Sequence, residues 1–415
     1  MFAKNSKQSS SVNLFLFMGA LLSGIVMLGT SQAISFVLME RGINVRAVSY
    51  VWLATIPYAW KFAMSPFIRS MISRYRHHMD IVKVIAYASQ VLVLILLSAL
   101  GWLAGFCTLP VLGTVIFVIV TAISIHDVIT AHIKLCLFEQ GNFGLITAIE
   151  NAGFRIGMFL SGACILYLAN FLNWTLAYIV IGGISLAVML TTFCMPNMQD
   201  TEEASTQQIR SIGSYVRMCF GFFKKHGILA MTCLLIAFKF ADSCINCLKS
   251  MFLYSLGVEK LAFANIAHLV GVVSMMISGI AAGYTIDKYG SKKSVPLAFV
   301  LQGAAALGFI YLAMFPVSIP CLTLIVNIET FIFGFSNVVF RSLMADLSCG
   351  NVNIYTMALS TGSALRIISY GIGGMLADLF SWTTVYLVCM FSNLPGLVLY
   401  MRWKYKGKDR SCANS

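Results

Sequence analysis

The chain has 415 residues, of which 59% are hydrophobic and 10% are charged. Soluble domains are about 45–50% apolar and about 25% charged, so this composition excludes an ordinary soluble fold. The net charge of +13 does not indicate nucleic-acid binding, because the basic residues lie in short segments between long apolar runs. The lipid bilayer is therefore the expected environment of the chain, and nucleic acid is not an expected partner.

Apolar runs of about 20 residues recur along nearly the whole chain. At about 1.5 Å per residue, a helix of that length crosses the ~30 Å hydrocarbon layer. We predict an all-α polytopic membrane protein with about twelve transmembrane helices, the first of which is too long for a signal peptide. The predicted spans are 12–39, 47–68, 81–104, 109–133, 144–169, 174–194, 227–254, 262–285, 294–315, 319–341, 355–379 and 382–402.

An even number of spans places both ends of the chain on one side of the membrane. If that side is the cytoplasm, most of the 28 lysines and arginines fall in cytoplasmic segments. The segments on the other side contain only Arg41, Arg46 and Lys260. Cytoplasmic loops are enriched in Lys and Arg, so we expect a multi-pass protein of the bacterial inner membrane with both termini in the cytoplasm.

The two halves of the chain resemble each other, since 169–178 reads ANFLNWTLAY and 377–386 reads ADLFSWTTVY. We predict two six-helix pseudo-repeats, a duplication typical of alternating-access transporters with a site between the halves. The expected domains are an N-terminal bundle at 1–195, a cytoplasmic linker at 196–226, a C-terminal bundle at 227–402 and a basic cytoplasmic tail at 403–415.

Between the predicted eighth and ninth spans, the string GYTIDKYGSKK combines glycines with a cluster of charges. Glycine permits a tight turn, and the aspartate and lysines are expected to form ion pairs that close the inner end of the protein and break during rocking. A charged turn without a gating role is the alternative. The predicted gating loop comprises Gly283, Asp287, Lys288, Gly290, Lys292 and Lys293.

An ionisable side chain at the bilayer centre costs about 2.5–3.5 kcal/mol, so those inside spans are candidates for function. Asp127 in the fourth span and Arg155 in the fifth lie at comparable depths and are expected to pair. Such a pair takes up and releases a proton as its environment changes; a static ion pair is the alternative. His126, beside Asp127, is either part of a proton relay or polar lining of the cavity mouth.

Other intramembrane charges lie in the second, seventh, tenth and eleventh spans. Lys239 and Asp242 stand three residues apart and share one helix face, where they form either a static pair or a substrate contact. Lys249 lies nearer the outer interface, toward which we expect its side chain to extend. The predicted substrate-binding residues are Lys61, Lys239, Asp242, Arg366 and Glu329.

The sequence contains no nucleotide-binding loop and no hydrolytic or metalloprotease motif. We therefore expect no enzyme activity, no cofactor and no metal site. Without a nucleotide site, transport has to be driven by a gradient, and protons are the expected coupling ion.

Several strings along the chain, in their order, are similar to those of one family. They include PYAWKFAMSPF around Lys61, the stretch from Asp127 through Arg155 to Gly162, FKFADS around Lys239, Gln302 with Gly303, and Trp382 with Tyr386. On these strings, the chain resembles the AmpG family of muropeptide permeases within the major facilitator superfamily.

The resemblance implies inward transport of anhydro-muropeptides, which are disaccharide–peptide fragments of the cell wall, together with protons. It also implies that Asp127 is needed for transport. We also expect the protein to act as a monomer. The chain departs from the family pattern at Arg69, His126, Ala131 and Lys249, where acidic, glutamine, aspartate and small polar residues are usual. These departures indicate that the substrate has shifted or that activity has been lost.

Two alternatives to muropeptide import stay open. One is a carrier of the same fold for another anionic or amphiphilic solute, such as an acyl-coenzyme A metabolite or an exported drug. The other is a membrane receptor or scaffold that transports nothing.

Overall fold

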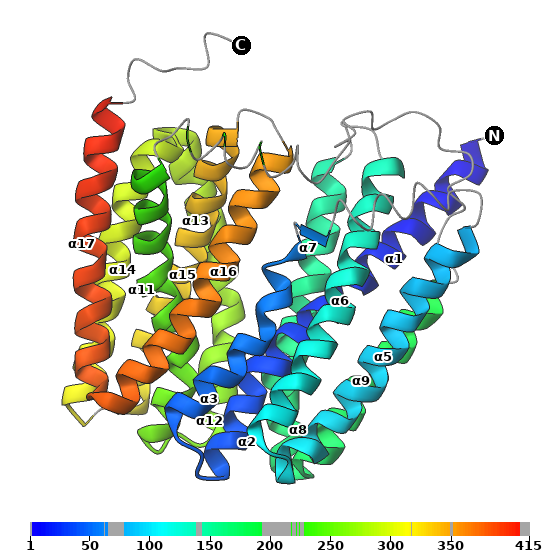
Figure 1. Cartoon of the computed structure of the whole chain (residues 1–415), viewed down its shortest axis with the longest axis horizontal. Helices are drawn as coiled ribbons and strands as arrows, with labels where there is room; N and C mark the ends of the chain where they lie inside the picture. The colour runs from blue at the N-terminus through cyan, green and yellow to red at the C-terminus, as the bar shows by residue number, and fades with distance from the viewer. Residues whose placement is uncertain are drawn as a thin grey trace. The chain divides into compact units, whose positions relative to one another are not determined.

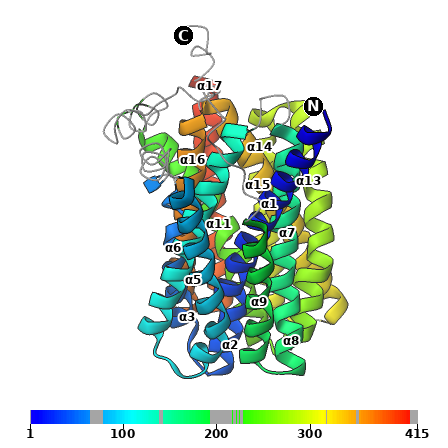
Figure 2. The ribbon, with the colours of Figure 1, turned by 90° about the vertical axis from the view of Figure 1, so that its right-hand side faces the viewer.

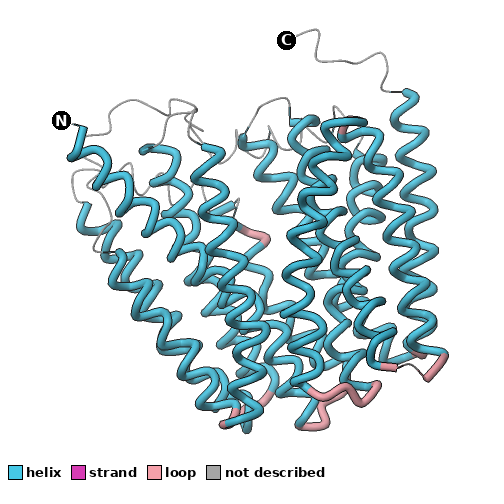
Figure 3. The backbone as a smooth tube through the Cα atoms, turned by 180° about the vertical axis from the view of Figure 1, so that it is seen from behind, coloured by secondary structure: helices cyan, strands magenta, loops and turns pink. Residues whose placement is uncertain are grey.

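The structure is a computed structural model that describes residues 2–61, 63–64, 79–137, 143–192, 217, 221, 224, 228–316, 318–348 and 352–406. These residues form helices joined by short loops, with no strand among them (Figure 3). Most of the predicted linker at 196–226, the loop around Arg69 and most of the tail at 403–415 lie outside the described residues. The prediction of an all-α protein is confirmed.

Contacts between Cα atoms divide the chain into two compact units. The first contains Met1–Gly42 and Ala54–Arg210, and the second contains Ile43–Leu53 and Ser211–Ser415. The short segment Ile43–Leu53, which belongs by sequence to the N-terminal half, therefore packs with the C-terminal helices.

In the first unit, long apolar helices match the predicted spans, except that α1 begins at Phe2, ahead of the predicted residue 12 (Figure 1). A π-helical turn interrupts two of them, at Gly29–Ala33 and at Leu160–Cys164. The helices of this unit are α1 (Phe2–Leu28), α2 (Ile34–Glu40), α5 (Met79–Phe106), α6 (Leu109–Leu137), α7 (Phe143–Phe159), α8 (Ile165–Phe171) and α9 (Trp174–Thr192).

Small residues let α1 and α7 lie directly against each other (Figure 2). A Cβ atom added at Gly24, Gly153 or Gly157 would collide with the backbone of the facing helix. Lipid tails are as apolar as the side chains on a helix surface, so the hydrophobic effect does not drive two helices together inside a membrane. Close packing of this kind is therefore a main source of their association.

The second unit is likewise built of long helices. A π-helical turn at Ala264–Leu269 again interrupts one long helix. Its helices are α3 (Val45–Val51), α11 (Ile228–Ser255), α12 (Lys260–Phe263), α13 (Val270–Tyr289), α14 (Ser291–Met314), α15 (Ile319–Ser348), α16 (Val352–Leu379) and α17 (Trp382–Lys406).

Helix pairing repeats from one unit to the other. In the first unit α1 packs on α7 and α5 packs on α9. In the second unit the corresponding helices make the same pairs, α11 with α16 and α14 with α17. The repeated tyrosines are core residues in both, since Tyr178 on α9 and Tyr386 on α17 are each 0% exposed. The predicted duplication is thus visible in the packing.

The second predicted span is not one regular helix. After α3 the chain turns into a 3-10 helix, Trp52–Tyr58, which contains Pro57. Proline lacks a backbone N–H and its ring clashes with the carbonyl four residues earlier, so Pro57 disfavours a regular α-helix at this point. Lys61 follows a turn at Ala59 and Trp60.

Among the described residues, nine helices are long and apolar enough to cross a membrane. The predicted second, seventh and eleventh spans are not among the nine, and each contains ionisable residues. Two of the three are nevertheless long helices, because α11 and α16 have 28 residues each. The count of twelve spans stays a prediction.

Candidate functional site

A half-buried ion pair lies inside the first unit, between Lys61 and Asp127 on α6. The two side chains are 26% and 19% exposed. Ser23 on α1 donates a hydrogen bond of 2.6 Å to Oδ2 of the same carboxylate. Asp127 is therefore held by a charge and a hydroxyl from two other segments, and both side chains of the pair stay partly exposed.

The irregular second span brings Lys61 to this position. Its ammonium lies 4.4 Å from the centre of the Tyr58 ring, and the Tyr58 hydroxyl donates a 3.2 Å hydrogen bond to the Ser23 carbonyl oxygen. A cation over an aromatic face is stabilised by the ring quadrupole. Lys61, Tyr58, Ser23 and Asp127 thus form one connected group.

The sequence pointed to Arg155 as the partner of Asp127, but the structure places Lys61 in that role. Arg155 lies on α7 with an exposed side chain. Comparable depth in two spans does not decide which helix faces meet, and the irregular backbone around Pro57 brings Lys61 to Asp127 instead.

His126 is a buried histidine, only 1% exposed, and so does not line a cavity mouth. Its Nε2 lies 2.9 Å from Nε2 of Gln90 on α5, and Oε1 of Gln90 accepts a 2.9 Å hydrogen bond from Thr192. Because Thr192 donates to the oxygen of this amide, its nitrogen faces the imidazole and donates to it. His126 therefore joins α6 to α5 and α9.

In the second unit, Lys239 and Asp242 on α11 face each other as expected, with Nζ 3.8 Å from Oδ2. Both are buried, with side chains 6% and 2% exposed. Lys239 also contacts α15, through a 2.8 Å hydrogen bond to Oδ1 of Asn337 and through the Phe340 ring, whose centre lies 4.4 Å from the ammonium. The ammonium is thus shared between α11 and α15.

Lys249 does not extend to the interface, contrary to the sequence prediction. It is 3% exposed and pairs with Glu329 on α15 at 2.5 Å. Glu329 also accepts a 3.3 Å hydrogen bond from Asn246, and Lys249 donates a second hydrogen bond, of 3.2 Å, to the Thr330 hydroxyl. Lys249 and Glu329 are 80 positions apart in the sequence, so helical periodicity, which relates residues three or four apart, could not predict that they pair.

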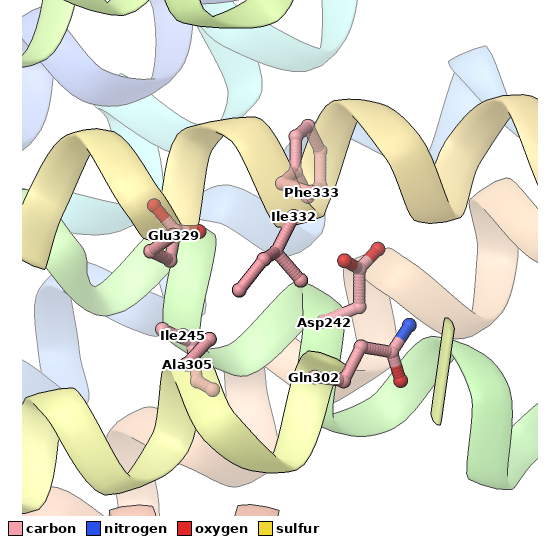
Figure 4. A pocket seen from close by; sticks show the side chains of 7 residues that line it. All are labelled: Asp242, Ile245, Gln302, Ala305, Glu329, Ile332 and Phe333. Atoms are coloured by element: carbon pink, nitrogen blue, oxygen red, sulfur yellow. The ribbon is translucent and has the colours of Figure 1, made fainter. Parts of the chain in front are cut away.

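A narrow cavity lies between α11, α14 and α15 (Figure 4). Its polar lining consists of Asp242, Glu329 and Gln302, a residue to which the sequence assigned no role. Gln302 on α14 is 1% exposed, and its Nε2 donates to the Phe238 carbonyl oxygen at 3.4 Å. The sequence could have pointed to Gln302, because a glutamine within an apolar helix needs a hydrogen-bond partner when it is buried. The other lining residues are Ile245, Ala305, Ile332 and Phe333.

Arg366 lies half-buried on α16, which packs against α11. Its charge acts on both Lys239 and Asp242. Of the predicted substrate-binding residues, Lys239, Asp242, Glu329 and Arg366 thus share the second unit, whereas Lys61 belongs to the first.

The predicted gating loop is a turn of one residue between α13 and α14. Gly290 has φ +79°, which only glycine adopts without strain. Ser291 donates to the Asp346 carboxylate and the Tyr400 hydroxyl to the Lys292 carbonyl oxygen, so the turn is tied to α15 and α17. Asp287 and Lys288 are exposed, and neither forms an ion pair within the described part of the chain.

Taken residue by residue, each unit offers fixed charges of both signs in a mostly apolar surrounding. Carboxylate and amino groups of a solute bind to such charges, and the apolar walls strengthen the attraction by excluding water. This arrangement fits binding and release of a charged solute.

Comparison with known proteins gives a consistent picture. A family model described as Major Facilitator Superfamily matches residues 16–365. A protein of Rickettsia felis whose name places it among the AmpG transporters is 25% identical over 399 residues, which cover 93% of this chain and 95% of that protein. The anhydromuropeptide permease of Escherichia coli strain K12 is 22% identical over 387 residues, 91% of this chain and 77% of that protein.

Two crystal structures of the nucleoside transporter NupG share the fold. The first, of a variant, has a TM-score of 0.74 at 14% sequence identity and covers 94% of this chain and 99% of that one. The second has a TM-score of 0.65, also at 14% identity. Identities this low describe the fold alone.

Proposed function

This chain belongs to the Major Facilitator Superfamily, and from that premise we propose that it is a proton-coupled permease for anhydro-muropeptides. The family and the fold are those of transporters. The substrate class is proposed from the similarity to the Escherichia coli permease, whose name specifies anhydromuropeptide. Transport is inward across the bacterial inner membrane, by alternating access of one chain with both termini in the cytoplasm.

The observation that carries the proposal is the Lys61–Asp127 ion pair, which is half-buried beside the broken second span. Anhydro-muropeptides carry carboxylates and an amino group. A substrate carboxylate competes with Asp127 for Lys61, and a proton that neutralises Asp127 releases Lys61 to bind it. Binding of the anion and of the proton therefore favour each other, as symport requires.

Arg155, His126 and the second-unit charges have supporting roles in this proposal. Arg155 has an exposed side chain on the helix that packs on α1, and we assign it to substrate carboxylates. Lys239 and Arg366 are the cations that we propose for substrate binding in the second unit. His126 acts by holding α6 in place through Gln90, and so positions Asp127.

Uptake of radiolabelled anhydro-muropeptide into proteoliposomes with an alkaline interior tests the proposal. We expect uptake above that of protein-free vesicles, and we expect a protonophore to abolish it. A matched uptake assay with an acyl-coenzyme A thioester distinguishes the proposed permease from a carrier of the same fold for another anionic solute. Uptake of the thioester without uptake of the muropeptide would replace the proposed substrate, and uptake of neither would favour a receptor.

Labelling from one side of the membrane tests the orientation. In a variant whose twelve native cysteines are replaced, a single cysteine introduced at Ser415 should react with an impermeant thiol reagent only in inverted vesicles. Reaction in right-side-out cells would place the C-terminus outside and contradict the proposed orientation.

A further inference from the structure

One hydroxyl on α1 forms its hydrogen bond outside its own helix. A serine or threonine inside a helix can satisfy its hydroxyl on the carbonyl oxygen four residues earlier. Thr30, Ser31 and Ser35, which follow in the same span, all do so. Ser23 is 4% exposed, and its hydroxyl instead donates at 2.6 Å to the Asp127 carboxylate, 104 positions away. The contact therefore needs an explanation other than the needs of the helix itself.

The two carboxylate oxygens of Asp127 have different surroundings. Oδ2 accepts hydrogen bonds from both the Ser23 hydroxyl and the Lys61 ammonium. Within the described part of the chain no hydrogen bond reaches Oδ1, which is not a buried atom. A carboxyl group that is protonated on one oxygen keeps the other as an acceptor. Oδ1 is therefore the oxygen open to a proton, and Oδ2 can keep the hydrogen bond from Ser23 in both charge states.

The backbone that carries Ser23 is held on two sides. A Cβ atom at Gly24 would collide with the backbone of α7, and the Ser161 hydroxyl donates to the Gly24 carbonyl oxygen at 3.3 Å. The Tyr58 hydroxyl donates to the Ser23 carbonyl oxygen at 3.2 Å. Lys61, by contrast, reaches the carboxylate through a flexible four-carbon stem. Of the two donors on Oδ2, Ser23 is thus the fixed one and Lys61 the movable one.

The other groups around this carboxylate come from α6, α1, α5 and the second span. On α6 itself, His126 interacts electrostatically with Asp127 and Lys61, and its ring faces the uncharged Gln90 of α5. From α1, which packs on α6, the contact is the uncharged Ser23 hydroxyl. The second span contributes the positive charge of Lys61. A proton on Asp127 therefore removes the attraction to Lys61, whereas the Ser23 hydroxyl keeps an acceptor.

From this geometry we propose that Ser23 is a positioning residue for Asp127, and that it holds Oδ2 in place while a proton binds and leaves at Oδ1. The inference rests on the proposed proton-coupled uptake and adds a residue to that site. A proton from the medium binds Oδ1, and the Lys61 ammonium, with its charge unchanged, leaves Oδ2 for a substrate carboxylate. When the proton leaves, Lys61 returns to the same oxygen, because Ser23 has kept the carboxyl group from turning.

Infrared difference spectroscopy of the purified full-length protein tests this contact without any substrate. On acidification we expect a carboxylic C=O band that is absent in Asp127→Asn. A hydrogen bond lowers the stretching frequency of a carbonyl group, so Ser23→Ala should move this band to higher frequency. The matched control Thr30→Val removes a buried hydroxyl that donates within its own span, and should leave the band in place. An unmoved band in Ser23→Ala, or an equal shift in Thr30→Val, overturns the proposal.

Transport assays separate this inference from the proposed function. We expect Ser23→Ala to slow uptake of labelled anhydro-muropeptide roughly 10-fold, the effect of losing one hydrogen bond to a charged group, and Thr30→Val to leave uptake unchanged. In the Asp127→Asn background Ser23→Ala should slow uptake no further, because the carboxyl group that it holds is absent. Independent losses in the two variants overturn the role of Ser23 alone. A wild type that takes up no muropeptide overturns the proposed substrate, and the infrared comparison still decides on Ser23.

Discussion

Arg46 on α3 holds Asp378 on α16 through two nitrogen atoms, with Nε at 2.9 Å and Nη2 at 2.5 Å from the same carboxylate oxygen. Nearby, the Trp52 and Tyr370 rings meet edge-on with centres 4.5 Å apart. A Cβ atom at Gly374 would collide with the Ser49 side chain. The segment Ile43–Leu53 is thus fixed to α16 by charge and by close packing, which explains why it groups with the second unit.

Exchanging the charges of this pair should show that it contributes modestly to stability. Arg46 and Asp378 side chains are 40% and 19% exposed, so we expect Arg46→Asp or Asp378→Arg alone to cost about 1 kcal/mol or less beyond the repulsion introduced. The double exchange should recover most of the loss. Thermal unfolding in detergent measures the loss of stability in each variant. A loss in the double variant equal to the sum of the two single losses would contradict the pairing.

Breaking the buried Lys249–Glu329 pair should be far more costly. With both side chains 4% exposed or less, Glu329→Leu leaves an unpaired buried ammonium, for which we expect a loss of ~3–5 kcal/mol. Lys249→Met together with Glu329→Leu removes both charges and should recover much of that stability. A double-mutant cycle on unfolding free energies provides the measurement. Independent, additive losses would show that the two charges do not interact.

Asp127→Asn should impair uptake without unfolding the protein. The amide keeps the size of the carboxylate but loses the charge that holds Lys61, so we expect at least ~10-fold slower uptake. Glu259→Gln is the matched control, because Glu259 is exposed and its side chain makes no capping hydrogen bond. Equal uptake by the two variants would remove Asp127 from the proposed mechanism.

Replacing glycine by alanine should have opposite effects on stability at Gly157 on α7 and at Gly183 on α9. At Gly157 a Cβ would collide with the Leu21 and Ile25 backbone of α1, so Gly157→Ala should force α7 away and lower the unfolding temperature. At Gly183 on α9 nothing lies within 4 Å of such an atom. Gly183→Ala should be neutral or stabilising by up to about 1 kcal/mol, because alanine favours helix. A similar response at both positions would contradict the α1–α7 packing.

Most helices were predictable because crossing a bilayer imposes a long apolar run. The predicted span 109–133, for example, lies inside α6, Leu109–Leu137. The same rule says nothing about irregularities, so the π-helical turns at Leu160–Cys164 and Ala264–Leu269 were not expected. They depend on tertiary packing, which hydropathy does not report.

The charged residues of the site were predictable as a set, but their partners were not always. Lys239 and Asp242 pair as expected, because one helical turn fixes their separation. Lys61 with Asp127 and Lys249 with Glu329 join different helices, so their pairing depends on helix rotation and on the break at Pro57. A list of intramembrane charges therefore identifies candidate residues, whereas the three-dimensional packing decides which of them neutralise each other.

Coupling of muropeptide and proton movement can be measured in proteoliposomes with equal pH on both sides and a weakly buffered medium. An inward gradient of anhydro-muropeptide should make the external medium more alkaline with the wild type, because protons enter with the substrate. Asp127→Asn should abolish the change. Substrate entry with no movement of protons, or no entry at all, would contradict a proton-coupled muropeptide permease.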